Sequence, residues 1–216
     1  MLALMPDALP DADQLATHWE AVYESNSPDA VSWYQSEPTV SLELIDALGV
    51  SPNAAVIDVG SGASILVDRL LTRGFTDMSV LDISEAALRT SRHRVGEDAA
   101  EVHWIVGDLL AWEPPRRYDL WHDRAVLHFL IGSDVAIYRA TVEWAVAPGG
   151  SVILATFAPD GPECCSGLPV TRYSTAELAA VLGDGFEVVV HRREAHRTPG
   201  GAEQPFTWIA ARRTSI

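Results

Sequence analysis

The chain of 216 residues contains no lysine, so all 15 of its basic residues are arginines. Without lysine, a Schiff-base enzyme, a lysine general base and a P-loop nucleotide hydrolase are excluded. Cysteine is almost as scarce, because Cys164 and Cys165 are the only two. Two neighbouring thiols cannot form a disulfide framework or fill a four-ligand zinc site, so we expect a reducing compartment and no metal site.

Long apolar runs are also lacking. No run approaches the roughly 18 residues of a transmembrane helix, and the first residues lack the basic flank of a signal peptide. The formal net charge is −15, from 30 acidic residues against 15 basic ones. This charge disfavours nucleic acid and anionic membranes as partners by Coulomb repulsion. The sequence therefore predicts a cytoplasmic protein that binds neither.

The length and composition of the chain predict one domain over residues 1–216. A chain of this length with 48% hydrophobic residues can form a sheet covered by helices. Within residues 1–50, two helices are expected before the sheet. The first is amphipathic, with Leu15, Trp19, Val22 and Tyr23 at helical spacing. From residue 51 onward, short buried strands alternate with helices, as in parallel β-α-β units.

The strands and helices of this alternating region predict the fold class. The expected parallel strands are residues 55–59, 78–82, 102–106, 118–122 and 151–157, and the helices between them are 65–73, 85–95 and 135–146. Two further β-rich runs, 186–190 and 206–211, predict an antiparallel hairpin. We expect a doubly wound α/β fold with a seven-stranded, mostly parallel sheet, an antiparallel C-terminal hairpin and helices on both faces.

A glycine-containing turn follows the first strand, in Asp58-Val59-Gly60-Ser61-Gly62. Glycines there let a ligand approach the free backbone N–H groups at the start of the next helix. Asp82 and Asp108 end the next two strands, where an acid of a doubly wound sheet accepts hydrogen bonds from ribose hydroxyls. The structural alternatives are a tight turn for the glycines and helix capping for the two acids.

Together these residues resemble the class I S-adenosylmethionine-dependent methyltransferase family, which also has a segment like Ala147-Pro148-Gly149-Gly150 before strand five. The resemblance spans about residues 30–213. Ser64 stands where Gly-x-Gly-x-Gly places its third glycine, and Ile65 where the dinucleotide pattern needs one. Serine is small enough and isoleucine is not, so the methyl donor is favoured and an NAD-dependent dehydrogenase is the lesser alternative.

The resemblance implies S-adenosylmethionine as cofactor and assigns roles along the sheet edge. It implies that Asp58, Gly60 and Gly62 bind the amino-acid end of the donor. It implies that Asp82 binds the ribose and that Asp108 and Leu109 bind the adenine. The remaining residues of the implied donor site are Trp33, Ser61, Ile83 and His122. Trp33 belongs to an aromatic segment that closes over the donor in relatives, so residues 1–50 are expected to form part of a lid and residues 51–216 the cofactor-binding core. Trp112 either covers the adenine or packs as an ordinary aromatic residue.

The segment after the fourth strand is the expected chemical site, because family members place residues there beneath the reactive methyl group. Its candidate catalytic residues are Asp123, Arg124 and His128. Asp123 and Arg124 could hold the charged methionine end of the donor or a substrate carboxylate, and a buried ion pair is the alternative. A role in the core is the alternative for His128 and for His122. Because a sulfonium already activates its methyl group, a base is needed only when the acceptor is protonated.

The acceptor is less determined by the sequence. The segment 121–125 resembles thiopurine-type methyltransferases, which favours a small-molecule acceptor. Trp33 and Tyr34 resemble eukaryotic lysine methyltransferase relatives, and an acidic surface suits a basic protein segment, so a protein lysine is an alternative. A non-catalytic adenosyl-binding or scaffold protein is the alternative from another class.

Two further segments are candidates for a substrate pocket. The loop 157–170 is long enough to act as a lid or binding element, and its two cysteines either bind a soft metal or are ordinary loop residues. His196 and Arg197 are expected in the connection of the hairpin, from which they could reach the same sheet edge.

Overall fold

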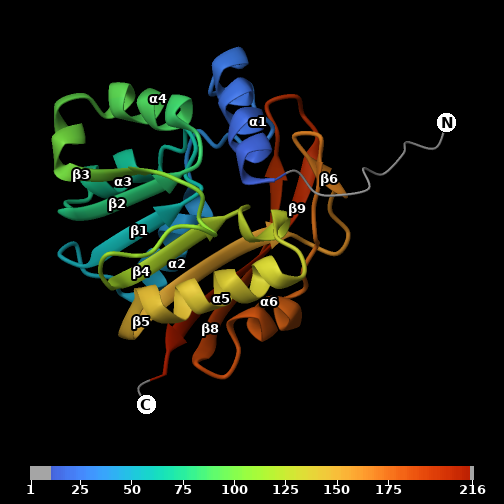
Figure 1. Ribbon diagram of the computed structural model, residues 1–216. Helices are drawn as coiled ribbons and strands as arrows, with labels where there is room; N and C mark the ends of the chain where they lie inside the picture. Colours follow the sequence, from blue (N-terminus) through green and yellow to red (C-terminus); the bar gives the residue numbers. More distant parts are fainter. Residues whose placement is uncertain (1–10, 215–216) are drawn as a thin grey trace.

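The sheet of the protein, seen in a computed structural model that describes residues 11–214, has the strand order β3-β2-β1-β4-β5-β9-β8 (Figure 1). Residues 1–10 and 215–216 of the predicted domain lie outside the described residues. The parallel strands are β1 (Ala55–Val59), β2 (Asp77–Asp82), β3 (Val102–Val106), β4 (Tyr118–Arg124) and β5 (Val146–Phe157). The antiparallel hairpin consists of β8 (Phe186–Arg197) and β9 (Glu203–Arg213), and β9 pairs with β5. The predicted fold class is confirmed.

Helices cover both faces of this sheet. Successive side chains of β1 point to opposite faces and pack against different helices. Val56 packs with buried residues of α2 (Thr39–Leu48), α3 (Leu66–Thr72) and α4 (Glu85–Val95). Its neighbour Ile57 points to the other face, against α5 (Ser133–Ala145) and α6 (Thr175–Leu182), which lie on the near side in Figure 1. Among the described helices, none is long and apolar enough to cross a membrane.

Helix α1 (Ala12–Ser25) differs from the others because it contains no buried residue. It begins at the N-cap Asp11, whose side chain accepts a hydrogen bond from the backbone of Gln14, and the Gln14 side chain returns one to complete a capping box. The helix packs near α4 at the carboxyl edge of the sheet (Figure 1). It therefore lies over the strand ends that the sequence marks as the binding site.

Several elements extend beyond their predicted bounds. Strand β4 continues to Arg124, because Arg124 pairs in register with Ala155 of β5. Strand β8 continues to Arg197, which pairs with Glu203, so His196 and Arg197 belong to a strand and not to the hairpin connection. The predicted position of these two residues was wrong, and the turn begins only after them.

Residues 158–182 contain structure that the sequence reading did not predict. A short hairpin of β6 (Cys164–Cys165) and β7 (Leu168–Pro169) turns through Ser166 and Gly167, both at positive φ, the geometry of a tight two-residue hairpin turn. Helix α6 follows, with a capping box between Ser174 and Glu177. The segment after β5 therefore contains a hairpin and a helix and is not an irregular loop.

Candidate active site

The turn after β1 is held against the end of β2. The N–H of Gly60 donates to the carbonyl oxygen of Leu81 at 2.7 Å, and the N–H of Gly62 donates to Oδ2 of Asp82 at 2.7 Å. Gly60 and Gly62 have φ of 60° and 56°, the left-handed region. A Cβ at Gly60 would lie 1.8 Å from Val126 Cγ2, and one at Gly62 would lie 2.0 Å from Tyr23 Oη. Both positions therefore need glycine.

Asp82 is the buried acid at the end of β2. Its second oxygen, Oδ1, accepts from the N–H of Ser84 at 2.8 Å, so two backbone donors orient the carboxylate. Burial raises the pKa of Asp82 to about 6, because loss of hydration outweighs the stabilising hydrogen bonds from Ser84 and Gly62. Each carboxylate oxygen still has a free lone pair for a ligand hydroxyl.

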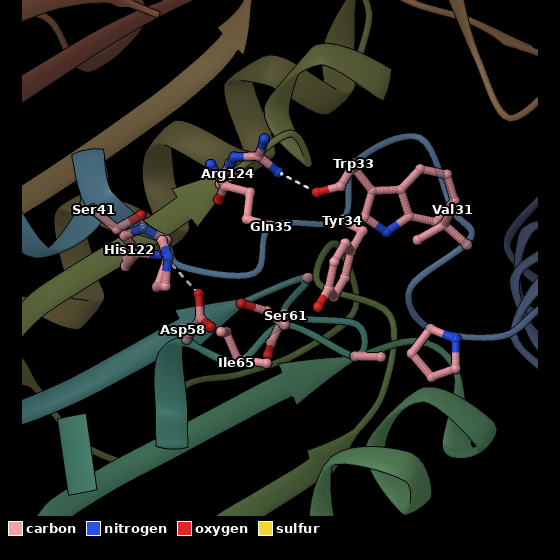
Figure 2. A pocket seen from close by; sticks show the side chains of 15 residues that line it. Val31, Trp33, Tyr34, Gln35, Ser41, Asp58, Ser61, Ile65, His122 and Arg124 are labelled. Atoms are coloured by element: carbon pink, nitrogen blue, oxygen red, sulfur yellow. Dashed lines mark hydrogen bonds and ion pairs between the residues drawn. The ribbon is translucent and has the colours of Figure 1, made fainter. Parts of the chain in front are cut away.

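A buried polar chain crosses from β1 to α2 through β4. Asp58 and His122 are partners in register, and His122 Nδ1 lies 2.6 Å from Asp58 Oδ1 (Figure 2). His122 Nε2 lies 2.9 Å from Ser41 Oγ, which fixes the ring between two partners. The other oxygen of Asp58, Oδ2, is buried without a hydrogen-bond partner. An unpartnered buried carboxylate oxygen marks a place for a cationic or hydrogen-bonding ligand group.

Two cavities meet at the carboxyl edge of the sheet. The large cavity, of about 340 Å³, runs from the strand ends of β2 and β3 to an aromatic end; its donor-side lining includes Asp82, Ile83, Asp108, Leu109 and Leu110. The small cavity, of about 50 Å³, is lined by residues that include Tyr34, Ser41, Asp58, Ser61 and His122. Trp33, Gly60 and Arg124 line both cavities. A ligand that passes over Gly60 would occupy both.

Arg124, the last residue of β4, is an incompletely paired cation between these cavities. One guanidinium N–H donates to the carbonyl oxygen of Trp33 at 3.1 Å, whereas Nε and Nη2 are buried without a partner. The guanidinium lies over the ring of Phe206, 4.6 Å from its centroid. Burial lowers the pKa of Arg124, but a guanidinium keeps its charge in proteins.

Aromatic rings close the large cavity at the end away from Asp108. Trp19 of α1 meets Trp33 at 5.7 Å and Phe129 at 5.3 Å between ring centroids, both edge to face. Cys165 of β6 also lines this end, and burial raises the pKa of its thiol to about 12. The thiol is therefore neutral at physiological pH.

Helix α1 is attached beside Asp82 by Glu20. The Glu20 carboxylate accepts from the Ser84 hydroxyl at 2.7 Å and from the N–H of Ala86 at 3.0 Å, at the N-terminus of α4. Burial opposes ionisation, but these hydrogen bonds outweigh it and lower the pKa of Glu20. A weaker contact, 3.4 Å between His18 Nε2 and Ser166 Oγ, links α1 to the β6–β7 hairpin.

Solved structures share this fold over nearly the whole chain. The 1,6-didemethyltoxoflavin-N1-methyltransferase of Burkholderia thailandensis was solved with 1,6-didemethyltoxoflavin and S-adenosylhomocysteine bound. It superposes with a TM-score of 0.74 at 21% identity, covering 98% of this chain and 94% of that one. The magnesium protoporphyrin IX methyltransferase of Synechocystis, solved with S-adenosylmethionine, gives 0.71 at 18% identity and covers 97% and 100%.

Sequence comparison points the same way. The chain is 24% identical to the eEF1A lysine and N-terminal methyltransferase of Mus musculus over 64% of this chain, and 22% identical to that of Bos taurus over 81%. It spans 20% and 24% of the length of these curated relatives. The family described as "Methyltransferase domain" matches residues 56–150, which include the glycine turn, Asp82, Asp108 and Arg124. Residues 56–150 therefore resemble a methyltransferase domain, and the solved methyltransferase structures share the fold of the chain.

The structure brings most of the predicted site residues together. The donor-site residues that line one or both cavities are Trp33, Asp58, Gly60, Ser61, Asp82, Ile83, Asp108, Leu109 and His122. Gly62 contributes its backbone N–H to Asp82. Arg124, predicted as catalytic, lines both cavities.

Asp123 and His128 line neither cavity. Asp123 accepts from the Tyr138 hydroxyl at 2.7 Å and from the N–H groups of Val126 and Leu127, which fixes the turn after β4. No ion pair joins it to Arg124 among the described residues. Burial and the charge of Arg124 lower the pKa of His128 to about 3, so its ring is neutral. The geometry gives both residues supporting roles and no support for the predicted catalytic ones.

The structure also places Trp112 and His196, for which the sequence left alternatives. Trp112 packs 6.4 Å from both Tyr118 and Trp121 and lines neither cavity, so the ordinary aromatic role holds. His196 lines neither cavity, but its Nε2–H donates to the carbonyl of Ser32 and so holds the segment before Trp33. Within residues 11–214, no group of three or more His, Cys, Asp or Glu side chains could hold a metal ion.

The sequence did not predict three contributions to the candidate site. Trp19 and Tyr23 were expected on the apolar face of the first helix, and that face lines the large cavity rather than the core. Glu20 lies on the same helix and gives no local signal, because its partners are backbone and hydroxyl groups of α4. Phe206 comes from the final strand and reaches Arg124 only through the sheet order.

Proposed function

We propose that this methyltransferase transfers the methyl group of S-adenosylmethionine to a small-molecule acceptor held in the large cavity. The observation that carries the proposal is the pair of cavities joined at Gly60, with an unpartnered Asp58 oxygen beside one and Asp82 with Asp108 beside the other. Structural neighbours solved with S-adenosylmethionine or S-adenosylhomocysteine support this choice of donor. When bound, the donor supplies a methyl group activated by its sulfonium.

The residues present fit each part of such a donor. The Asp58 Oδ2 atom and the Ser61 hydroxyl are both buried without partners, and they would hold the amino-acid end. Asp82 would accept hydrogen bonds from the ribose hydroxyls, and Asp108 with Leu109 would border the adenine. His122 and Ser41 orient Asp58 for this task.

The chain's own contribution to catalysis is orientation and the exclusion of water. Gly60 lets the donor lie close to the backbone, and Val126 packs above that glycine. Trp19 and Trp33 cover the cavity and displace water from the reacting atoms. Alignment of this kind accounts for a large part of the rate of a two-substrate reaction.

Titration calorimetry of the wild type and of Asp82→Ala tests the donor assignment. We expect the wild type to bind S-adenosylmethionine and not NAD, and the variant to lose at least about tenfold in donor affinity, because two ribose hydrogen bonds to a charged group are removed. Asp82→Asn is the matched control for shape. Binding of NAD without binding of S-adenosylmethionine would contradict the proposal.

A labelled-donor assay tests the acceptor class. Cell extract divided into small-molecule and protein fractions is incubated with the enzyme and methyl-labelled donor, and we expect label in the small-molecule fraction. The curated relatives are named as lysine and N-terminal methyltransferases, so a protein acceptor is the second candidate, and label confined to protein would favour it. Donor binding with no turnover in either fraction would favour a non-catalytic adenosyl-binding protein.

We further propose that the enzyme acts in the cytoplasm and uses neither nucleic acid nor a membrane. The support is the net charge of −15, which repels polyanions and anionic lipids. The reducing environment of the cytoplasm also suits the free thiols of Cys164 and Cys165. Localisation of a fluorescent fusion in living cells tests this expectation.

A further inference from the structure

In the described part of the chain, the lining of the aromatic end of the large cavity has one charged side chain, Arg124. The lining also includes Trp19, Trp33, Phe129, Phe206 and Cys165, which together form an apolar chamber beside Arg124. The acids that also line the cavity belong to other parts of it. Asp82 and Asp108 end strands β2 and β3, and Asp11 and Asp134 lie at the starts of α1 and α5. The charges of Glu194 and Asp58 act on Arg124, but neither residue lines the large cavity. Within residues 11–214, a molecule in the aromatic end therefore contacts one cation and no anion of the lining.

Arg124 has hydrogen-bonding capacity left for such a molecule. Its Nε and Nη2 groups are buried and unpartnered, although buried N–H groups in native proteins are almost always paired. In Figure 2 the guanidinium lies next to the carbonyl of Trp33, on the opposite side of the labelled group from Asp58 and Ser61. Because Arg124 also lines the large cavity, its unpartnered donors lie beside the aromatic end.

Among the side chains that the structure describes, the aromatic end also lacks a group that could remove a proton from an acceptor. The Cys165 thiol is protonated because burial raises its pKa to about 12. His128 lies behind the wall, and its ring nitrogen Nδ1 faces the N–H of Phe157. Arg124 is a permanent cation and cannot act as a base at neutral pH. An acceptor that binds here must arrive with a free electron pair.

We infer that the acceptor is a compact, apolar and aromatic molecule that bears an anionic nucleophile, and that this anion binds Arg124. The inference rests on the proposed function and specifies its acceptor. A lone pair of the acceptor anion forms the bond to the methyl carbon as the carbon–sulfur bond breaks, and the electron pair of that bond stays on sulfur. The negative acceptor and the positive sulfonium become two neutral products at this centre, and no proton is transferred.

Burial of opposite charges explains why this acceptor would be selected. An anion beside Arg124 forms charge-assisted hydrogen bonds in a water-poor cavity, where they are stronger than at the surface. An amine or lysine ammonium of similar size would place a second cation next to the guanidinium, which the low dielectric makes costly. The aromatic walls add contact area for a flat molecule.

Three isosteric probes test the inference: benzoate, benzamide and benzamidinium, which share one planar shape and carry negative, zero and positive charge. Calorimetry is performed on enzyme already loaded with S-adenosylhomocysteine, so that the donor's own carboxylate is present. We expect benzoate to bind at least about tenfold more tightly than benzamide, and benzamidinium to bind most weakly. In Arg124→Gln this order should collapse to within about threefold, whereas Arg192→Gln, at an exposed arginine of β8, should keep it.

The outcomes of this experiment separate the two levels of proposal. Equal affinity for benzoate and benzamide would mean that Arg124 is already neutralised by the donor, and it would overturn the inference. Preference for benzamidinium, or failure of all three probes to bind the loaded enzyme, would overturn it as well. Failure of S-adenosylhomocysteine itself to bind would instead overturn the proposed function on which the inference depends. The wild-type series decides the matter even if Arg124→Gln does not fold.

Discussion

Asp82 accepts hydrogen bonds from the backbone of Gly62 and Ser84, and we propose that it also binds the donor. Its protonation should therefore control donor affinity. The Asp82 carboxylate is ionised above a pKa of about 6, so its capacity to accept ribose hydrogen bonds is present at pH 7.5 and is lost as the pH falls through 6. We expect the Kd for S-adenosylmethionine to be about tenfold higher at pH 5.0 than at pH 7.5. Asp82→Asn should show weak binding that changes little over this range. An unchanged wild-type Kd would contradict the raised pKa.

Gly60 offers a second test at the scale of single residues. Gly60→Ala should destabilise the fold by about 1–3 kcal/mol and abolish donor binding, because the new methyl group would lie 1.8 Å from Val126 Cγ2 and the residue has φ of 60°. Urea denaturation measures the free energy of unfolding. Val126→Ala removes the clashing methyl group, so the double variant should recover part of the lost stability. No recovery would mean that backbone strain, and not the clash, causes the loss.

At the scale of elements, the attachment of α1 through Glu20 should control how long the donor stays bound. Glu20 accepts from the Ser84 hydroxyl, and the N–H of Ser84 orients Asp82, so Ser84 connects α1 to the proposed ribose-binding residue. Glu20→Gln weakens these hydrogen bonds, and we expect the donor to dissociate about 3–10 times faster. Stopped-flow fluorescence of Trp19 and Trp33 measures this rate.

Glu24→Gln is the matched control for the Glu20 variant. Glu24 lies one turn further along α1 and is exposed, and its substitution by glutamine changes the net charge by the same amount. Its donor dissociation rate should equal that of the wild type. Equal acceleration in both variants would assign the effect to charge alone and would contradict a specific attachment.

The elements that the sequence predicted well are those with a local signal. The strands of the parallel sheet combine apolar runs with glycine or acidic ends, and β3 and α4 have the predicted bounds. Helix α6 lies between the predicted loop 157–170 and the predicted run 186–190, and it was not predicted although Ser174 and Glu177 form a capping box. The β6–β7 hairpin is too short for any periodicity, and its turn depends on the positive φ of Ser166.

The same distinction applies to the active site. Asp58, Asp82 and Asp108 were predictable because parallel strands bring their carboxyl ends to one edge. The difference between Arg124 and Asp123 was not, because neighbouring residues of a strand point to opposite sides and only packing decides which side is the cavity. The hydroxyl of Tyr138 in α5 donates a hydrogen bond to Asp123, and a sequence alone does not show that contact.

For the molecule as a whole, the excess of acidic residues predicts stabilisation by salt. Screening reduces repulsion within a chain of net charge −15, whereas exposed ion pairs such as Arg193 with Asp160 contribute little stability that salt could remove. We expect Tm at pH 7.5 to rise by about 2–4 °C between 20 and 300 mM NaCl, as for a change of about 1 kcal/mol. The rise should vanish near the isoelectric point of about 4.7. A fall in Tm at pH 7.5 would mean that ion pairs dominate.

Because α1 buries none of its residues, its backbone should exchange amide hydrogens through local opening rather than through unfolding of the whole domain. A ligand that fills the space between Trp19 and Arg124 would hold the helix down and slow exchange across residues 12–25. Deuterium uptake by this one segment would then report occupancy of the cavity without any turnover. Candidate acceptors could be ranked in mixtures by the protection that they give to α1.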